Sequence, residues 1–354
     1  MKKNLATIYA IFCTLLLAAG FVLCFVFAWK AGTWKTAECL LGLVLGFALA
    51  PVLHETGHIV FAEAANMQLV YAKFFCLKIY EKEGKKRLGF ASPFSPDETQ
   101  VVPKSGGDMQ RRATLYTLGG LIVGGAFLLI ILAAAILCTA LNATRFTLWG
   151  MIPYTAYLCL LNLPPVEYAS GKTDTLVWRG IRKGYDGEKT MLAAMEIQGQ
   201  LFAGKSFSEI DKKWYFDLPQ LCEDEPLFAV MLDLKYRYFL EKEELVQAAD
   251  CLNRLASAQA YLPDAEVEKL AAELTYMHAL RGDLESAEES GKLCKEYLQS
   301  ETASAKRILL AYAKAAGKTE ALAPLKEQAE KCLEYEKIAG VRKLEEILLS
   351  RIEI

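Results

Sequence analysis

Residues 40–65 read LLGLVLGFALAPVLHETGHIVFAEAA. The stretch is apolar up to His54, and apolar residues resume at Ile59, directly after two histidines and the glutamate between them. Ionisable side chains are expensive inside a membrane-spanning helix, and where they occur they generally have a function. We therefore predict a functional site within a transmembrane helix. In a competing interpretation, residues 54–58 lie just past the end of the span, at the membrane interface.

The motif in residues 54–58 is HETGH, which fits the pattern H-E-x-x-H. Residues i and i+4 of a helix lie on one face, so His54 and His58 can converge on one metal ion. Glu55 lies beside that pair and can act as a general base on a water molecule at the ion. The chain contains three histidines. The third, His278, belongs to a predicted soluble helix, where we expect a structural or surface role.

Outward from this motif, the chain separates into an apolar part and a charged part. Hydrophobic residues make up 53% of its 354 residues and the mean hydropathy is +0.20, yet charged residues still reach 23%. Each apolar run approaches the roughly 20 residues that a spanning helix needs, so we predict about four transmembrane helices. The runs extend from about Leu5 to Trp29 and over about 38–65, 113–141 and 146–163. The first run exceeds the about 7–15 apolar residues of a secretory signal, which favours a membrane anchor.

The distribution of positive charge orients the predicted spans. The linker 66–112 is rich in Lys and Arg, whereas the two short loops on the other side carry only Lys30, Lys35 and Arg145. Positively charged loops stay in the cytosol, which puts the linker, both termini and everything after Arg179 there. The ten cysteines include no C-x-x-C pair, which is typical of reduced thiols. We expect an integral protein of a bacterial cytoplasmic membrane.

The linker contains two short alternating segments, Val70–Tyr80 and Arg87–Phe90, separated by Glu81–Lys86. This pattern predicts a β-hairpin on the cytosolic side. The expected fold is an all-α membrane protein with this small hairpin, followed by a soluble α-helical domain. The expected boundaries are 1–36 for the anchor, 37–180 for the membrane core and 187–354 for the helical domain.

The predicted helical domain is rich in Ala, Leu, Glu and Lys. Residues 270–294 align with residues 305–329 at an offset of 35, close to the 34 of a tetratricopeptide helix pair. The alignment superimposes Gly282 on Gly317, and glycine suits the left-handed turn between two helices. The domain resembles tetratricopeptide repeats without their usual Trp and Pro signatures, so a generic helical bundle stays open.

The surface of this domain allows two interpretations, a protein-binding groove or a solvated helix surface. A protein partner is therefore one expectation. The chain's net charge of −2 argues against a nucleic-acid partner, because the chain has no overall excess of positive charge to neutralise phosphate groups.

A catalytic zinc ion commonly has three protein ligands, and the two histidines supply only two. Residues 161–174 (LNLPPVEYASGKTD) follow the fourth predicted span. Asn162 and Pro165 interrupt a membrane helix, and non-helical backbone at this depth is tolerated where it lines a polar cavity. Asp174 follows at a point where the chain can return to the metal, with Glu167 as the alternative ligand.

The two motifs together resemble the site-2 protease family of intramembrane zinc metalloproteases. That family pairs H-E-x-G-H on one span with N-x-x-P, followed by Asp, on a later span. The matching residues here are His54, Glu55, Gly57 and His58 for the first motif, and Asn162 and Pro165 for the second. Residues 111–120 (RRATLYTLGG) resemble the start of the family's middle core span. The likeness covers about residues 38–180.

Asp174 departs from the family's commonest pattern. It comes twelve residues after Asn162, later than usual, and it is followed by Thr175 instead of glycine. The longer spacing resembles a variant with Ser-Gly-x-x-Asp, which Ser170 and Gly171 would represent.

The resemblance implies zinc-dependent hydrolysis of a peptide bond within or beside the membrane, with a membrane protein or membrane-associated peptide as substrate. It implies that His54, His58 and Asp174 hold one Zn²⁺ and that Glu55 is the general base. Asn162 would bind the substrate backbone or the developing oxyanion. It also implies a sheet whose edge receives extended substrate, for which Val70–Tyr80 is the candidate; a simple cover over the metal is equally compatible.

Two other functions stay open. A catalytically inactive membrane scaffold would recruit partners through its helical domain, although such a protein has no use for Glu55. A metal-dependent membrane enzyme acting on a bond other than a peptide is the third hypothesis. In every case, the glycines of the third span (Gly119, Gly120, Gly124 and Gly125) permit close approach of a neighbouring helix.

Overall fold

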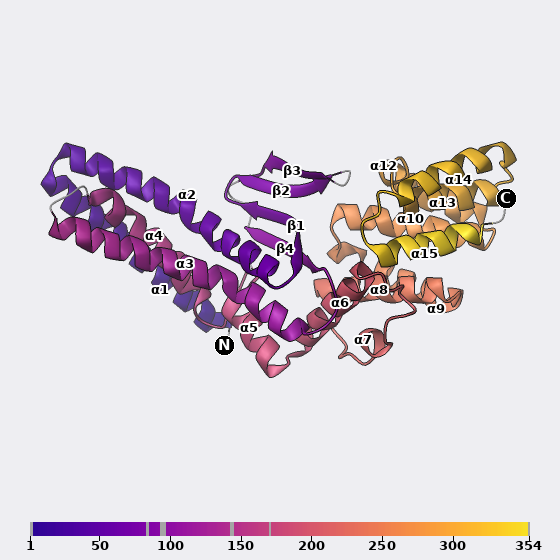
Figure 1. Cartoon of the computed structure of the whole chain (residues 1–354), viewed down its shortest axis with the longest axis horizontal. Coiled ribbons are helices and arrows are strands. Elements are labelled where there is room, and N and C mark those ends of the chain that lie inside the picture. Colours follow the sequence, from indigo (N-terminus) through magenta and orange to yellow (C-terminus); the bar gives the residue numbers. More distant parts are fainter. Residues whose placement is uncertain (1–2, 83–84, 93–96, 142–144, 170, 353–354) are drawn as a thin grey trace. The chain divides into compact units, whose positions relative to one another are not determined.

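The computed structural model describes residues 3–82, 85–92, 97–141, 145–169 and 171–352, and helices predominate among them (Figure 1). The chain forms two compact units. We call Met1–Val102 with Asp108–Tyr185 the membrane unit, and Pro103–Gly107 with Asp186–Ile354 the helical unit. Residues 1–36, the predicted anchor, fall within the membrane unit.

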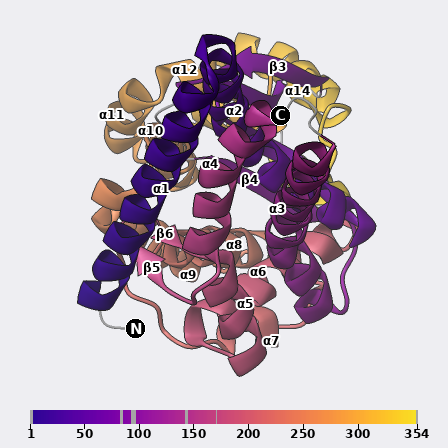
Figure 2. The same cartoon turned by 90° about the vertical axis from the view of Figure 1, so that its left-hand side faces the viewer.

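Three helices of the membrane unit are long and apolar enough to cross a membrane: α1 (Lys3–Ala31), α2 (Thr33–Ala64) and α3 (Met109–Ala140). They coincide with the first three predicted spans. The fourth predicted span is α4 (Phe146–Asn162), a helix of 17 residues. Helix α4 packs against α1, α2 and α3, and Figure 2 shows it between α1 and α3. Whether α4 crosses the membrane stays a prediction.

Small residues allow α2 to approach its neighbours closely. A Cβ on Gly57 of α2 would overlap the carbonyl oxygen of Gly119 on α3, and a Cβ on Gly150 of α4 would overlap the carbonyl oxygen of Cys39 on α2. Close backbone contact of this kind is the usual means of helix association in membranes, where no hydrophobic effect drives it. The predicted close packing by the third span is confirmed at Gly119 and Gly120, whereas a Cβ on Gly125 would meet nothing within 4 Å.

A four-stranded sheet follows α2, in the order β3-β2-β1-β4. Its strands are β1 (Met67–Phe74), β2 (Leu77–Lys82), β3 (Lys85–Phe90) and β4 (Glu98–Pro103). Strand β2 pairs antiparallel with β1, where Phe74 faces Leu77, and with β3, where Leu77 faces Phe90.

The predicted hairpin was wrong in its first strand. Val70–Tyr80 is not one strand, because the chain turns at Phe75, whose φ is +53°, and divides the segment between β1 and β2. The turn contains no glycine or asparagine, the residues from which a left-handed turn would be predicted. It is held from a distance instead: Asp97 accepts hydrogen bonds from the Phe75 amide and from Lys73, each at 2.8 Å.

The segment after α4 returns the chain to the other spans. Helix α4 ends at Asn162, as predicted from Asn162 and Pro165. The short strands β5 (Glu167–Tyr168) and β6 (Gly171–Lys172) then pair and lead into α5 (Asp174–Lys183). Thr173 caps α5, because its hydroxyl accepts from the Leu176 amide at 3.3 Å. The cap makes Asp174 the first residue of α5, which packs against α3.

The helical unit is a succession of short helices, and three consecutive pairs pack together: α8 with α9, α10 with α11, and α13 with α14. Gly282 and Gly317, at the turns of the last two pairs, have φ values of +73° and +69°. The predicted left-handed turns are therefore confirmed, while a tetratricopeptide array stays a prediction. The helices are α6 (Asp186–Phe202), α7 (Lys213–Phe216), α8 (Pro226–Glu241), α9 (Leu245–Ser257), η1 (Gln259–Tyr261), α10 (Asp264–Leu280), α11 (Leu284–Leu293), α12 (Lys295–Leu298), α13 (Ala303–Ala315), α14 (Thr319–Leu333) and α15 (Ala339–Ser350).

A charged cluster is buried in the core of the helical unit. The Arg307 guanidinium donates to Glu345 at 2.7 Å and to Glu273 at 2.8 Å, and it lies over the Tyr276 ring at 4.0 Å. Glu273 also accepts from the Tyr236 hydroxyl at 2.7 Å. Burial raises the pKa of Glu273, but Arg307 more than offsets it, so that the net shift is downward.

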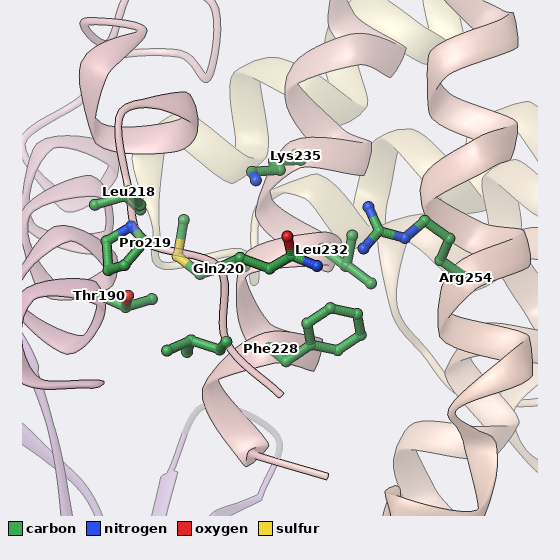
Figure 3. A pocket seen from close by; sticks show the side chains of 10 residues that line it. Thr190, Leu218, Pro219, Gln220, Phe228, Leu232, Lys235 and Arg254 are labelled. Carbon is green, nitrogen blue, oxygen red and sulfur yellow. The ribbon is translucent and has the colours of Figure 1, made fainter. Parts of the chain in front are cut away.

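Residues 103–107, which begin at the last residue of β4, pack on α6. The Gly107 amide donates to both carboxylate oxygens of Glu196, at 2.8 and 3.1 Å. A Cβ on Gly106 would lie 2.6 Å from Glu196 Oε1, so glycine is required for this approach. Elsewhere in the helical unit, a cavity of about 290 Å³ opens beside α8, with Lys235 and Arg254 on its walls (Figure 3).

Candidate metal centre

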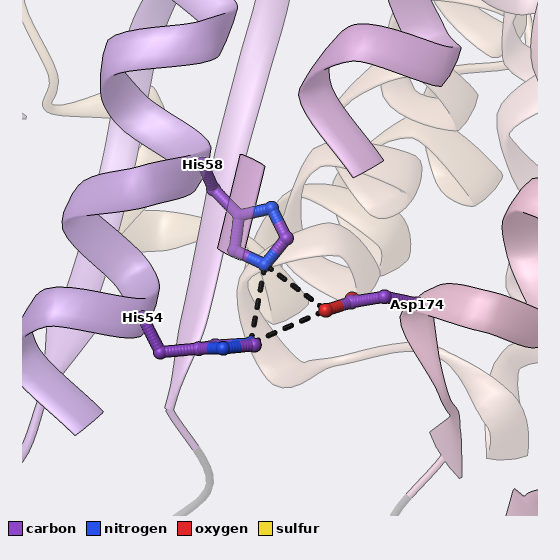
Figure 4. Close-up of side chains that lie close together, drawn as sticks. All are labelled: His54, His58 and Asp174. Atoms are coloured by element: carbon purple, nitrogen blue, oxygen red, sulfur yellow. Dashed lines mark hydrogen bonds and ion pairs between the residues drawn. The ribbon is translucent and has the colours of Figure 1, made fainter. Parts of the chain in front are cut away.

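Three side chains from two distant parts of the sequence converge in the membrane unit (Figure 4). His54 and His58 lie one turn apart on α2, and Asp174 begins α5. The His54 and His58 Nε2 atoms are 3.3 Å apart, and Asp174 Oδ2 lies 3.3 Å from the first and 3.5 Å from the second. Among the described residues, this is the group of His, Cys, Asp and Glu side chains whose geometry could hold a metal ion.

These separations fit a small tetrahedral cation. Ligands about 2.0–2.1 Å from such an ion lie about 3.3–3.4 Å from one another. The Nδ1 atom of His58 is 2.8 Å from the backbone carbonyl oxygen of Tyr116, which can only accept, so Nδ1 carries the proton and Nε2 of the neutral ring keeps its lone pair. Asp174 Oδ2 is buried and makes no hydrogen bond within the described part of the chain. The three atoms thus present lone pairs to one point.

The charge of Asp174 also suits a ligand. Burial alone would raise its pKa, but where no metal is bound the His54 and His58 imidazoles, in their protonated form, outweigh burial and lower the pKa of Asp174 to about 2. The carboxylate is therefore ionised at neutral pH. An ionised carboxylate and two imidazoles form a ligand set that suits zinc and other divalent first-row metals.

Helix α3 leaves room for the two imidazoles only because it carries glycine at one position. A Cβ on Gly120 would overlap Nε2 of His58 and would lie 2.8 Å from Nε2 of His54. The glycine pair predicted from the sequence therefore has two separate roles. Gly119 permits backbone contact with α2, and Gly120 makes space for the ligands.

Glu55 projects from the same turn of α2 and is 7% exposed. The Thr99 hydroxyl of β4 donates to Glu55 Oε2 at 2.5 Å. The Tyr116 hydroxyl of α3 in turn donates to the Thr99 carbonyl oxygen. Tyr116 thus supports both sides of the site, since its own carbonyl oxygen accepts from His58.

The structure separates the two acidic candidates for third ligand. Asp174 lies beside the histidines, whereas Glu167 is exposed on β5, across from Lys172. Asn162, the predicted substrate-binding residue, directs its side-chain amide to the Leu158 carbonyl oxygen at 3.4 Å. Its own carbonyl oxygen accepts from the Thr175 hydroxyl at 2.6 Å, which ties the end of α4 to the start of α5. Ser170, part of the variant motif, lies outside the described residues.

Thr99 and Tyr116 are the site residues that sequence reasoning missed. Thr99 comes from an edge strand of ordinary composition, and nothing in its surroundings distinguishes it. Tyr116 lies within the segment 111–120 that carries the family resemblance. That resemblance did not predict its contacts with His58 and Thr99. The third histidine, His278, belongs to α10 of the helical unit, where its ring lies 3.6 Å from the Asp283 carboxylate. It is therefore in a different unit from the candidate metal ligands.

No family model matches the chain, and no curated protein or solved structure shows significant similarity to it.

Proposed function

We propose that this chain is an intramembrane zinc metallopeptidase, similar to the site-2 proteases, that hydrolyses a peptide bond in or near a transmembrane segment. The observation that carries this proposal is the convergence of His54, His58 and Asp174, with Glu55 on the same helix turn as the histidines. The apolar surroundings of α2 add to it. Ligands and a carboxylate base have no structural use in a helix that is otherwise apolar.

The proposed reaction divides the work among the chain's own residues. His54, His58 and Asp174 hold the metal. A bound Zn²⁺ supplies Lewis acidity, which polarises the scissile carbonyl and lowers the pKa of a water molecule. Glu55 takes a proton from the attacking water through its free oxygen and delivers it to the nitrogen of the leaving amine. Thr99 holds the other oxygen of Glu55, so the carboxylate keeps one orientation through both proton transfers.

Substrate must reach this site as extended chain, because a helix satisfies its own backbone hydrogen bonds. The segment expected to pair with it, Val70–Tyr80, forms β1 and β2, and both of these strands have neighbours on each side. We therefore propose β4 in its place. It is an edge strand of the sheet, and it carries Thr99, which touches Glu55. A strand paired on β4 runs beside the general base.

The helical unit is the part that we propose to recruit a substrate protein or a regulator. The cavity in Figure 3 has a lining of mixed polarity with two basic side chains, which suits a segment that combines apolar groups with a negative charge. An inactive scaffold would also recruit partners in this way. We favour the enzyme, because Glu55 is intact and lies next to three converging ligands.

Metal analysis of the purified full chain tests the proposal. We expect one zinc ion per chain in the unaltered protein and none in His54→Ala. Glu55→Gln should keep the metal and lose hydrolysis, and His278→Ala should keep both. Pure, folded protein that binds no metal would sink the proposal, and full metal binding with no hydrolysis of any captured membrane protein would favour the scaffold.

Substrate identity can be approached with the same variants. Glu55→Gln should retain bound substrate, because the site is complete apart from its base. His54→Ala lacks the metal and should release it. Proteins that co-purify with Glu55→Gln but not with His54→Ala are the candidates, and their cleavage by the unaltered chain identifies substrates.

A further inference from the structure

A cavity of about 720 Å³ lies at the end of the membrane unit where α1 finishes and α4 begins. Helices α1 and α4 form its walls, and Thr139 near the end of α3 contributes to it. The Trp149 indole donates to the Thr139 hydroxyl at 3.1 Å, which fixes that ring at the rim. Leu23, Phe27, Lys30, Arg145 and Phe146 are among the other residues that line it.

Two positively charged side chains, Lys30 and Arg145, line this cavity. The sequence puts only three cations near this end of the helices: Lys30, Lys35 and Arg145. Lys35 is neutralised by Glu38 at 2.9 Å. Lys30 and Arg145 are the other two, and both line the cavity although 115 residues separate them in sequence. Within the described residues neither has an ion pair, and Arg145 only stacks on the Phe146 ring at 5.3 Å.

The walls of the cavity suit a hydrocarbon chain. Apart from the two cations and Thr139, its lining consists of apolar side chains, glycine and a thiol. Leu23 and Phe27, which belong to these walls, are 57% and 64% exposed in the isolated chain, as expected for surfaces that face lipid. Only 6% of the most apolar part of α1 is buried inside the chain. The cavity therefore opens toward acyl chains as well as toward the membrane surface.

The charge of the rim selects among lipids. Two cations held at one cavity repel each other, and a phosphate group between them removes that repulsion. A zwitterionic headgroup brings its own cation and gains less from the site. Basic pockets between transmembrane helices are known to suit anionic headgroups.

We propose that this cavity binds one anionic phospholipid, with its phosphate between Lys30 and Arg145 and an acyl chain along α1 and α4. A partner helix fits less well, because the two unpaired cations at the cavity favour an anionic group over an apolar helix surface. The proposal does not depend on peptidase activity.

Native mass spectrometry of the full chain in detergent tests it. The protein is titrated with phosphatidylglycerol or with phosphatidylcholine of the same acyl chains. We expect about tenfold or greater preference for phosphatidylglycerol, and its loss in the double variant Lys30→Gln/Arg145→Gln. Lys35→Gln removes one positive charge at the same end of the molecule and is the matched control. It should leave the preference unchanged.

Three results would overturn the proposal. Equal binding of the two lipids would mean that the cavity merely holds hydrocarbon. An equal loss in Lys35→Gln would mean that general surface charge, not the cavity, attracts the headgroup. Displacement of the lipid by inorganic phosphate at millimolar concentration would mean that the site recognises a free anion. An unchanged elution profile of each variant shows that it is folded.

Discussion

Both units bury a cluster of charged or ligating side chains, but the negative charge of the carboxylates is balanced differently in the two clusters. In the helical unit, Glu273 and Glu345 surround Arg307, so the cation is part of the chain. In the membrane unit, His54, His58 and Asp174 surround a point where the described residues place no cation. The Arg307 cation lies within the first cluster, although Arg307 Nη1 and Glu345 Oε1 have no hydrogen-bond partner among the described residues. The second is a group of ligand atoms that could hold a cation supplied from outside the chain.

The comparison extends to the carboxylates themselves. Glu273 accepts from Tyr236 and from Arg307, and the guanidinium keeps it ionised and unreactive. Glu55 accepts from the neutral Thr99 hydroxyl, which orients it without supplying a positive charge. A buried carboxylate held by a neutral donor can still take up a proton. The two carboxylates thus differ in whether a hydrogen-bond donor to them carries a positive charge.

The strongest test of this comparison is the space around the metal ligands. We expect Gly120→Ala to abolish metal binding, because the new methyl group would overlap His58 Nε2 and force the two imidazoles to move. Metal content measured on the purified variant should fall from one ion per chain to none. Gly125→Ala adds the same methyl group to the same helix where nothing lies within 4 Å, and it should keep the metal. Normal metal content in Gly120→Ala would contradict the assignment of the ligands.

The second test removes the Arg307 cation from the buried cluster of the helical unit. Arg307→Leu leaves two buried carboxylates unpaired and should lower the free energy of unfolding of the helical unit by about 3–5 kcal/mol. Hydrogen exchange of the α10 and α13 amides measures the loss, and the metal content should not change. Arg281→Gln, at an exposed position, should stay within about 0.5 kcal/mol of the unaltered chain. Comparable losses in the two variants would argue against a special role of the buried cluster.

A third test concerns the neutral donor. Thr99→Val keeps the shape of the side chain and removes the hydrogen bond to Glu55, a charged acceptor. We expect about tenfold lower kcat with KM and metal content unchanged, because such a bond contributes about 1.5–3 kcal/mol. Turnover of a substrate captured with Glu55→Gln is the measurement. Thr99→Ser restores the hydroxyl and should recover most of the rate; if it does not, Thr99 matters for the packing of β4 and not for its hydroxyl.

The smallest effect sharpens the contrast between glycines of the two units. Gly282 is needed for its backbone conformation, at φ +73°, and not for space, since a Cβ there would meet nothing within 4 Å. Gly282→Ala should therefore cost about 1–2 kcal/mol of stability. Gly291, inside α11, has only ordinary contacts, so Gly291→Ala should stabilise by about 0.5–1 kcal/mol. Thermal unfolding of both variants checks the opposite signs.

Local patterns in the sequence predicted much of the architecture and part of the site. Three apolar runs were long enough to be recognised as span-length helices, and the spacing of His54 and His58 placed both on one helix face. Asn162 and Pro165 predicted where α4 ends, and Gly282 and Gly317 predicted left-handed turns. Each of these features depends on residues within one or two turns of one another.

The features that were missed depend on distant partners. The turn at Phe75 forms because Asp97, 22 residues later, accepts from its amide. Thr99 reaches Glu55 across 44 residues, and Tyr116 reaches Thr99 only after the chain has passed through β4 and into α3. Hydrogen bonds of this kind have no periodicity and no characteristic residue type. A single sequence contains no signal for them.

The attachment of residues 103–107 to α6 has a consequence for synthesis on the ribosome. Gly107 and the Glu196 carboxylate that receives its amide are 89 residues apart. At roughly 5–20 residues per second, Glu196 is made about 4 to 18 seconds after Gly107. Until then, the Gly107 amide lacks its Glu196 acceptor, although all residues of α2, including His54 and His58, have already been synthesised. In the order of synthesis, Asp174 therefore follows His54 and His58, and Glu196, which accepts from the Gly107 amide, follows Asp174.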